Sequence, residues 1–160
     1  MMTYAVVRVR SDVNVKPDIK ETLRQLRLHR INHCILVPET PPYKGMLQKA
    51  KDYITWGEVS ASTLALLLSE RGELDGARIT DEVVSRCTPY NDVRALGTAI
   101  AKGDAILAQI KGAKPVLRLH PPRGGYEGIK RSFRAGGALG YRGKGINELL
   151  LRMLGPGGED

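Results

Sequence analysis

Cysteine and aromatic residues are scarce in this chain of 160 residues, which has two Cys, one Phe and one Trp. Cys34 and Cys87 lie far apart and form no Cys-x-x-Cys pair, so we expect buried free thiols in a reducing cytosol rather than a disulfide. So few rings make an aromatic base-stacking sheet improbable. No apolar run approaches the roughly 20 residues of a membrane-spanning helix.

Enzyme signatures are also missing. A phosphate-binding loop needs Gly-x-x-x-x-Gly-Lys followed by Ser or Thr. Gly143–Lys144 supplies the Gly-Lys pair, but Ala138 stands at the upstream glycine and Gly145 at the hydroxyl position. We also expect no direct strand-to-helix junction there. The Gly-x-x-Gly pattern of residues 140–143 resembles the motif with which KH domains hold an RNA backbone. Glycine is frequent in this segment by composition, so the pattern alone is weak evidence.

The three histidines do not form a catalytic or metal-binding set. His29 and His33 are four residues apart, but the helix before them should end near Leu28, and Cys34 is the sole nearby third ligand. We expect polar loop histidines beside RNA or solvent. His120 has no neighbouring Ser, Cys or acid with which it could form a catalytic set, so we expect it to bind phosphate or a carbonyl. The sequence therefore predicts no catalytic residue and no metal site.

Positive charge is present in excess and in blocks. Lys and Arg number 25 against 17 Asp and Glu, which gives a net charge of +8 and predicts an anionic partner. Residues 1–51 have ten basic and four acidic residues, whereas residues 69–92 have six acids and three arginines. The chain after Leu117 is basic again. The blocks indicate two faces that meet an anion, while the middle stays in solvent or binds protein.

Glycine and arginine concentrate in residues 117–145. Glycine has much backbone freedom and the segment has few apolar side chains, so we expect a loop that orders on a polyanion. Its arginine side chains and bare amides suit phosphate. A Pro-Pro pair at 121–122 should stiffen its start.

Periodicity predicts mixed helices and strands. Two amphipathic helices alternating with three strands indicate a sheet with helices packed on one face. The expected strands are Thr3–Arg10, Cys34–Val37, Ile54–Val59 and Val116–Leu119. The expected helices are 17–28, 43–53, 60–71, 81–86, 92–102 and 146–154.

Two segments resemble the large-subunit ribosomal protein L-thirty family in its long archaeal form, akin to the eukaryotic L-seven protein. Residues 23–59 contain the Leu-x-Leu-x-Arg-x-Asn-His-Cys run and a later Gly-Met-Leu-x-Lys-Ala-x-Asp-Tyr-Ile stretch. Residues 117–140 contain Arg-Leu-His-Pro-Pro-Arg-Gly-Gly, and the terminal helix also matches. Residues 60–114 match only in length and helical character.

The resemblance implies an α+β fold: a ferredoxin-like split β-α-β core at 1–59, a mainly helical insertion at 60–114, and a basic glycine-rich extension at 115–160 that ends in a helix packed on the core. It implies a structural role in the large ribosomal subunit, in the cytoplasm, with one copy per ribosome, and neither catalysis nor a cofactor. The expected partners are 23S ribosomal RNA and neighbouring proteins, with 5S RNA as an open alternative.

The RNA-binding residues expected from these arguments lie in helix-end turns and in the glycine-rich segment. They are Arg27, Arg30, Asn32, His33, Tyr43, Lys44, Lys49, His120, Arg123, Tyr126, Lys130, Arg131, Arg134, Tyr141, Arg142 and Lys144. Helix N-termini expose amides that bind phosphate, and tyrosines can stack on unpaired bases.

Two other hypotheses stay open at this point. One is an RNA-processing or nucleotide-binding protein that uses the glycine-rich segment as a phosphate cradle. The other is an adaptor whose acidic middle binds protein, which is compatible with the ribosomal role.

Overall fold

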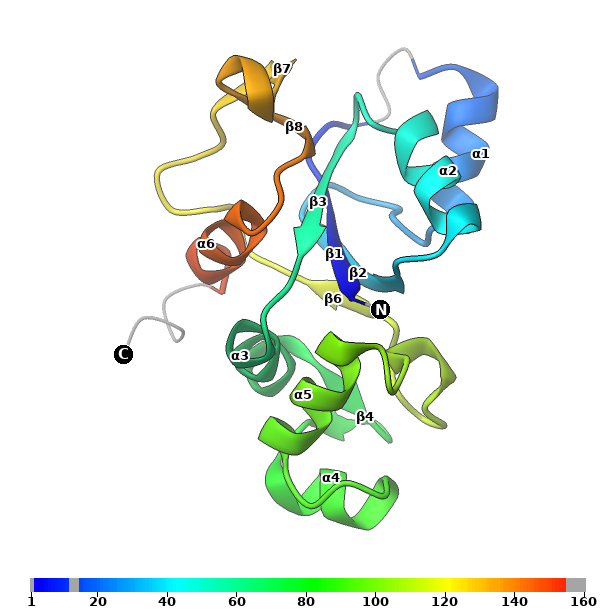
Figure 1. The fold of residues 1–160 in the computed structure, drawn as a ribbon, viewed down its shortest axis with the longest axis vertical. Coiled ribbons are helices and arrows are strands. Elements are labelled where there is room, and N and C mark those ends of the chain that lie inside the picture. Colours follow the sequence, from blue (N-terminus) through cyan, green and yellow to red (C-terminus); the bar gives the residue numbers. More distant parts are fainter. Residues whose placement is uncertain (1, 12–14, 155–160) are drawn as a thin grey trace.

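A six-stranded sheet forms the centre of the molecule in the computed structural model, which describes residues 2–11 and 15–154 (Figure 1). Its strands lie in the order β6-β2-β1-β3-β8-β7. They are β1 (Thr3–Arg8), β2 (His33–Pro38), β3 (Ile54–Glu58), β6 (Val116–Arg118), β7 (Gly128–Ser132) and β8 (Gly137–Tyr141). β1 pairs antiparallel with β2 and β3, β2 pairs antiparallel with β6, and β8 is parallel to both β3 and β7.

Two helices cover one face of this sheet, as the sequence predicted. They are α1 (Pro17–Gln25) and α2 (Pro41–Lys49), each with proline in its first turn, where the fixed φ and missing N–H are tolerated. Alternate residues of β1 serve the two faces, because successive side chains of a strand point in opposite directions. Tyr4 and Val6 pack against α1 and α2, whereas Ala5 and Val7 pack on the other side.

The second face is covered as well, by helices from the middle and the end of the chain. These are α3 (Ala61–Arg71), α5 (Val93–Lys102) and α6 (Gly145–Arg152), with α4 (Asp81–Cys87), the short pair β4 (Glu73–Leu74) and β5 (Ala77–Arg78), and the 3₁₀ turn η1 (Leu107–Gln109) farther out. One apolar core joins Ala5, Leu64, Leu96 and Leu149. The middle segment therefore completes the core of the sheet, and the α+β class predicted from the sequence is confirmed.

Local signals set the helix boundaries. Ser60, Thr80 and Asp92 each accept a hydrogen bond from a backbone N–H in the first turn of α3, α4 and α5, which satisfies one of the free amides at a helix start. The first helix is shorter than the predicted 17–28, because Arg27 has a positive φ of 64° and such a residue cannot continue a right-handed helix. The second covers 41–49 rather than 43–53.

The glycine-rich segment is not one continuous loop, which corrects the prediction. It contains β7, the 3₁₀ turn η2 (Phe133–Ala135) and β8, and β8 leads into α6 across three residues, so a strand-to-helix junction does exist here. Glycine is required where backbones meet. A Cβ on Gly57 would lie 1.9 Å from the Gly143 carbonyl oxygen, and one on Gly137 would lie 2.1 Å from the Arg131 carbonyl oxygen.

The two cysteines differ in burial. Both are free thiols; Cys34 is fully buried, as expected, whereas Cys87 is only half-buried. Burial raises the pKa of the Cys34 thiol to about 12, which keeps it protonated at neutral pH.

Candidate nucleic-acid interface

The turn between α1 and β2 presents cations to solvent. Leu28 anchors it, because its side chain is buried and its N–H donates to the Leu23 carbonyl at 3.0 Å. On either side of this anchor Arg27, His29 and Arg30 are exposed. The turn thus projects three basic side chains around one apolar residue.

A row of basic residues continues from this turn across three strands. His33 pairs with Arg118 of β6, and Arg8 of β1 lies near His33 and contributes to its electrostatics. Arg8 is 2% exposed and donates to the Leu28 carbonyl at 2.7 Å, so it supports the turn from below. Arg118 is exposed and was not among the predicted contacts. The period-two pattern of Val116 and Arg118 around a buried Leu117 was the signal for it.

The electrostatics of this row oppose any further positive charge. Burial lowers the pKa of His33, and Arg118, His29, Arg30 and Arg8 lower it further. A neutral imidazole is the result at neutral pH. Its buried Nδ1 has no hydrogen-bond partner among the described residues. We call Arg27, His29, Arg30, His33 and Arg118 the turn surface.

The predicted cations of α2 already have acidic neighbours. Lys44 Nζ lies 3.4 Å from Glu39, and Lys49 Nζ lies 3.9 Å from Asp18. Both lysines are exposed, so each pair adds little stability. Tyr43 is half-buried against the core under α1 and α2.

A second group of cations lies at the opposite edge of the sheet, on and beside β7 (Figure 1). Every residue of β7 is exposed. Lys130, Arg131 and Arg134 make no ion pair within the part of the chain that the structure describes. Lys144, also exposed, occupies the position just before α6 and makes no capping hydrogen bond with its side chain. We call Lys130, Arg131, Arg134 and Lys144 the edge surface.

Arg142 has an internal position. Its side chain is buried; Nε donates to Thr55 Oγ1 at 2.8 Å and Nη2 donates to the Ala138 carbonyl at 2.9 Å. The guanidinium lies 4.7 Å from the centre of the Phe133 ring and 3.8 Å from Glu127. Burial lowers the pKa of Arg142, and Glu127 opposes that shift. Arg142 therefore joins β8, β3 and η2.

Arg152 fixes the segment between β6 and β7. Its Nη1 donates to the carbonyls of Arg123 and Gly125 at 2.9 and 3.1 Å, and its Nη2 lies 3.3 Å from Glu127. The single acid of the glycine-rich segment is thus shared by two arginines. As a result, it does not weaken the edge surface by exposing an unpaired negative charge.

Tyr126 and Asn32 bind each other rather than projecting outward. The Tyr126 hydroxyl donates to Asn32 Oδ1 at 2.6 Å, and burial raises the pKa of Tyr126. Asn32 is buried and has a positive φ of 67°, a conformation that asparagine tolerates. This contact links the α1–β2 turn to the glycine-rich segment. His120 and Arg123 lie between β6 and β7, in the same segment as Tyr126, and their side chains are exposed.

Tyr141 is exposed beside two acids. The residue is 48% exposed, and its ring lies 6.3 Å from the rings of both Tyr4 and Trp56. Its hydroxyl donates to Glu58, and that bond, more than burial, raises the pKa of Tyr141 to about 12. Glu39 lies close enough to add to the shift. Phosphate would meet repulsion from both carboxylates here.

The Gly143–Lys144 pair does not form a phosphate cradle. Gly143 lies against Gly57 of β3, and the Asn147 side chain donates to the carbonyls of Glu58 and Lys144 at 3.2 and 2.9 Å. Over the described part of the chain, no three His, Cys, Asp or Glu side chains gather where they could hold a metal ion. In residues 2–11 and 15–154, no helix combines the length and apolarity needed to cross a bilayer.

Comparison with known proteins identifies similar chains. A family model described as "Ribosomal protein L30p/L7e" matches residues 4–54. The chain is 52% identical over 151 residues to the protein named "Large ribosomal subunit protein uL30" of Methanocorpusculum labreanum, with 94% of this chain and 99% of that protein covered. It is 54% identical over 152 residues to the protein of the same name from Methanosphaera stadtmanae, again with 94% and 99% covered.

Proposed function

Because the chain belongs to the L30p/L7e family of large-subunit ribosomal proteins, we propose that its turn surface and edge surface hold it on ribosomal RNA. The protein is a structural component of the large ribosomal subunit in the cytoplasm and not an enzyme. Ribosomal RNA and neighbouring ribosomal proteins are therefore its partners. The particular surfaces, and 23S RNA with possible 5S contacts in one copy per ribosome, are our proposal.

The distribution of free cations carries this proposal. The edge surface combines exposed side chains with the absence of ion-pair partners among the described residues, so its charges are available to phosphate. The turn surface adds the neutral imidazole of His33 beside Arg118, and the Nδ1 of this ring has no hydrogen-bond partner among the described residues. Neither surface places several rings in a row, which favours recognition of phosphates and shape over base stacking.

Three predicted contacts receive other roles in this proposal. Arg142 is buried with its guanidinium engaged by protein, and Tyr126 and Asn32 are bonded to each other. We propose that they position the two surfaces. Tyr141 lies beside Glu58, so we also leave it outside the phosphate-binding set. The other predicted residues with exposed cations stay in it.

Salt dependence tests the proposal directly. If about six to ten phosphates are neutralised, the affinity for protein-free large-subunit RNA should fall about 10³- to 10⁵-fold between 50 and 200 mM salt. Filter binding of the full chain measures this. An affinity independent of salt would contradict binding through these cations.

Sedimentation tests the ribosomal role separately. In a sucrose gradient of a cell extract the protein should travel with the large subunit. Recovery only at the top of the gradient would overturn the assignment itself, whatever the filter assay gave.

A further inference from the structure

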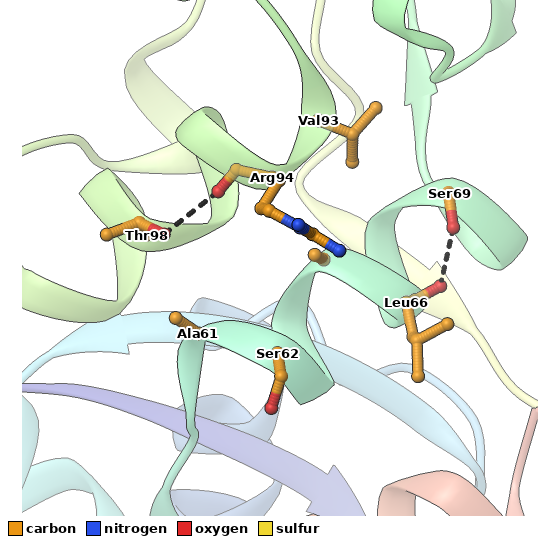
Figure 2. A pocket seen from close by; sticks show the side chains of 8 residues that line it. Ala61, Ser62, Leu66, Ser69, Val93, Arg94 and Thr98 are labelled. Atoms are coloured by element: carbon orange, nitrogen blue, oxygen red, sulfur yellow. Dashed lines mark hydrogen bonds between the residues drawn. The ribbon is translucent and has the colours of Figure 1, made fainter.

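A groove lies between α3 and α5 (Figure 2). These two helices lie far from β7, the strand of the edge surface (Figure 1). Its volume is about 590 Å³. The residues that line it come from one face of each helix and are mostly small or apolar: Ala61, Ser62, Ala65, Leu66, Ser69, Val93, Arg94 and Thr98. A groove between two packed helices matches the shape of a third helix.

Small side chains create this groove. Gly97 brings the two helices close together, since a Cβ there would lie 3.2 Å from the Ala65 backbone. Ala61 and Ala65 then leave space along α3, one turn apart. At the rim Leu66 is 46% exposed. An exposed leucine beside an apolar groove enlarges the exposed apolar surface, and such surfaces mark sites of protein interaction.

The hydroxyl groups of the groove are already satisfied. Ser69 donates to the Leu66 carbonyl at 3.1 Å and Thr98 donates to the Arg94 carbonyl at 2.9 Å, as Figure 2 shows. Ser62 lies 3.4 Å from Ser60 through their hydroxyl oxygens. An apolar surface could therefore cover the groove without leaving these groups unpaired, which would otherwise be costly.

Arg94 is the exception. Its side chain extends over the groove (Figure 2), and its guanidinium has no hydrogen bond or ion pair within the described ranges 2–11 and 15–154. A partner that covers the groove must supply an acceptor for this guanidinium, and a carboxylate is the best one. Residues 60–114 contain seven Lys or Arg and seven Asp or Glu, so this region has no net charge to attract RNA.

We propose that the groove docks an amphipathic helix of a neighbouring protein in the large subunit. Apolar side chains of that helix, three or four residues apart, fill the space beside Leu66, and one of its carboxylates pairs with Arg94. The inference rests on the proposed function in one respect only, that the partner is found in the same particle.

A photo-crosslinker incorporated in place of Leu66 tests the proposal in assembled large subunits. We expect a crosslink to one ribosomal protein, at a helical segment with apolar residues and a nearby Asp or Glu, identified by mass spectrometry. A crosslinker in place of Ser69 should reach the same segment, which guards against a local effect at Leu66. A crosslinker at Glu82 of α4, outside the groove, should not reach it.

Charge reversal then tests the role of Arg94. Arg94→Glu should lower the crosslink yield about tenfold, whereas Arg86→Glu on α4, an equal change outside the groove, should leave it unchanged. Replacing the identified partner carboxylate by Lys should restore the yield with Arg94→Glu.

Several results would overturn the docking proposal. They are a crosslink to RNA, a crosslink to a second copy of this chain, or no crosslink from either position in particles that contain the protein. Failure of the unmodified chain to sediment with the large subunit is different, because it would overturn the proposed function instead.

Discussion

Residues 60–114 and residues 115–154 both pack into the core of the sheet, yet the second also depends on arginine contacts and close glycine contacts. The first segment is rich in leucine, and its helices α3 and α5 bury Leu64, Leu67 and Leu96 against the sheet. The second buries Leu117 and Leu149 in the same core, but Arg142, Arg152 and the contact of Gly57 with Gly143 hold its glycine-rich part.

The two segments use positive charge differently. In the C-terminal segment, Arg142 and Arg152 bind backbone carbonyls and Glu127. The cations on β7 and η2 are exposed and can bind a partner. Within residues 60–114, acidic and basic residues balance. We infer that one segment meets RNA and the other meets protein.

The largest expected effect is on the apolar segment. Leu64 is fully buried, so Leu64→Ala should lower the free energy of unfolding by about 3 kcal/mol, since it removes apolar contacts and leaves a cavity. Urea denaturation followed by circular dichroism measures it. Leu66→Ala, at an exposed position of the same helix, should change stability by less than about 0.5 kcal/mol.

The same experiment tests the division of the chain into 1–59, 60–114 and 115–160, which stays a prediction. Because one apolar core joins the sheet and α3, Leu64→Ala should shift a single transition. Two separate transitions would show that the segment 60–114 folds independently.

The second effect concerns the buried cation. Arg142→Met should lower the free energy of unfolding, measured by the same urea denaturation, by about 2 kcal/mol. The buried Thr55 hydroxyl and Ala138 carbonyl then lose their hydrogen-bond donor. Arg142→Lys should recover only part of it, since an ammonium cannot reproduce the forked geometry. Arg134→Met, at an exposed position, is the matched control. An equal loss from Arg134→Met would remove the distinction between buried and exposed cations.

The third effect concerns RNA. Arg131→Glu with Arg134→Glu should weaken binding to large-subunit RNA about tenfold or more in the filter assay. Arg86→Glu with Lys111→Glu makes the same charge change in residues 60–114 and should leave affinity nearly unaltered. Equal losses from both pairs would mean that net charge, rather than the edge surface, controls binding.

Much of the fold could be predicted from local signals. Pro17, Ser60, Asp92 and the valine-rich start of the chain mark helix and strand boundaries within a few residues. The strands β7 and β8 could not be predicted, because their glycines and cations lack a strand pattern. β8 is selected by its pairing with β3, and that long-range contact has no local signal in the sequence.

The candidate site was predictable by residue type but not by burial. The sequence identifies Arg131, Arg134 and Arg142 alike as basic residues among glycines. Only the fold distinguishes Arg142, since its neighbours Thr55 and Phe133 come from β3 and η2. Arg118 was not predicted as a contact. The alternation in β6 indicates only that its side chain is exposed, and its place beside His33 depends on the pairing of β6 with β2.

The smallest expected effect is the titration of His33 on the turn surface. Its pKa in the folded protein lies below the ordinary 6.5 because of burial and nearby cations. The unfolded chain therefore binds more protons at this site, and stability should fall as the pH is lowered through 6.5 and then through the folded pKa. His33→Gln should flatten that part of the curve of unfolding free energy against pH.

Arg118→Gln should raise the pKa of His33 in an NMR titration, since Arg118 is its strongest charged neighbour. Bound RNA should raise it too, because phosphate favours the protonated ring. A pKa that RNA leaves unchanged would place phosphate on the edge surface alone.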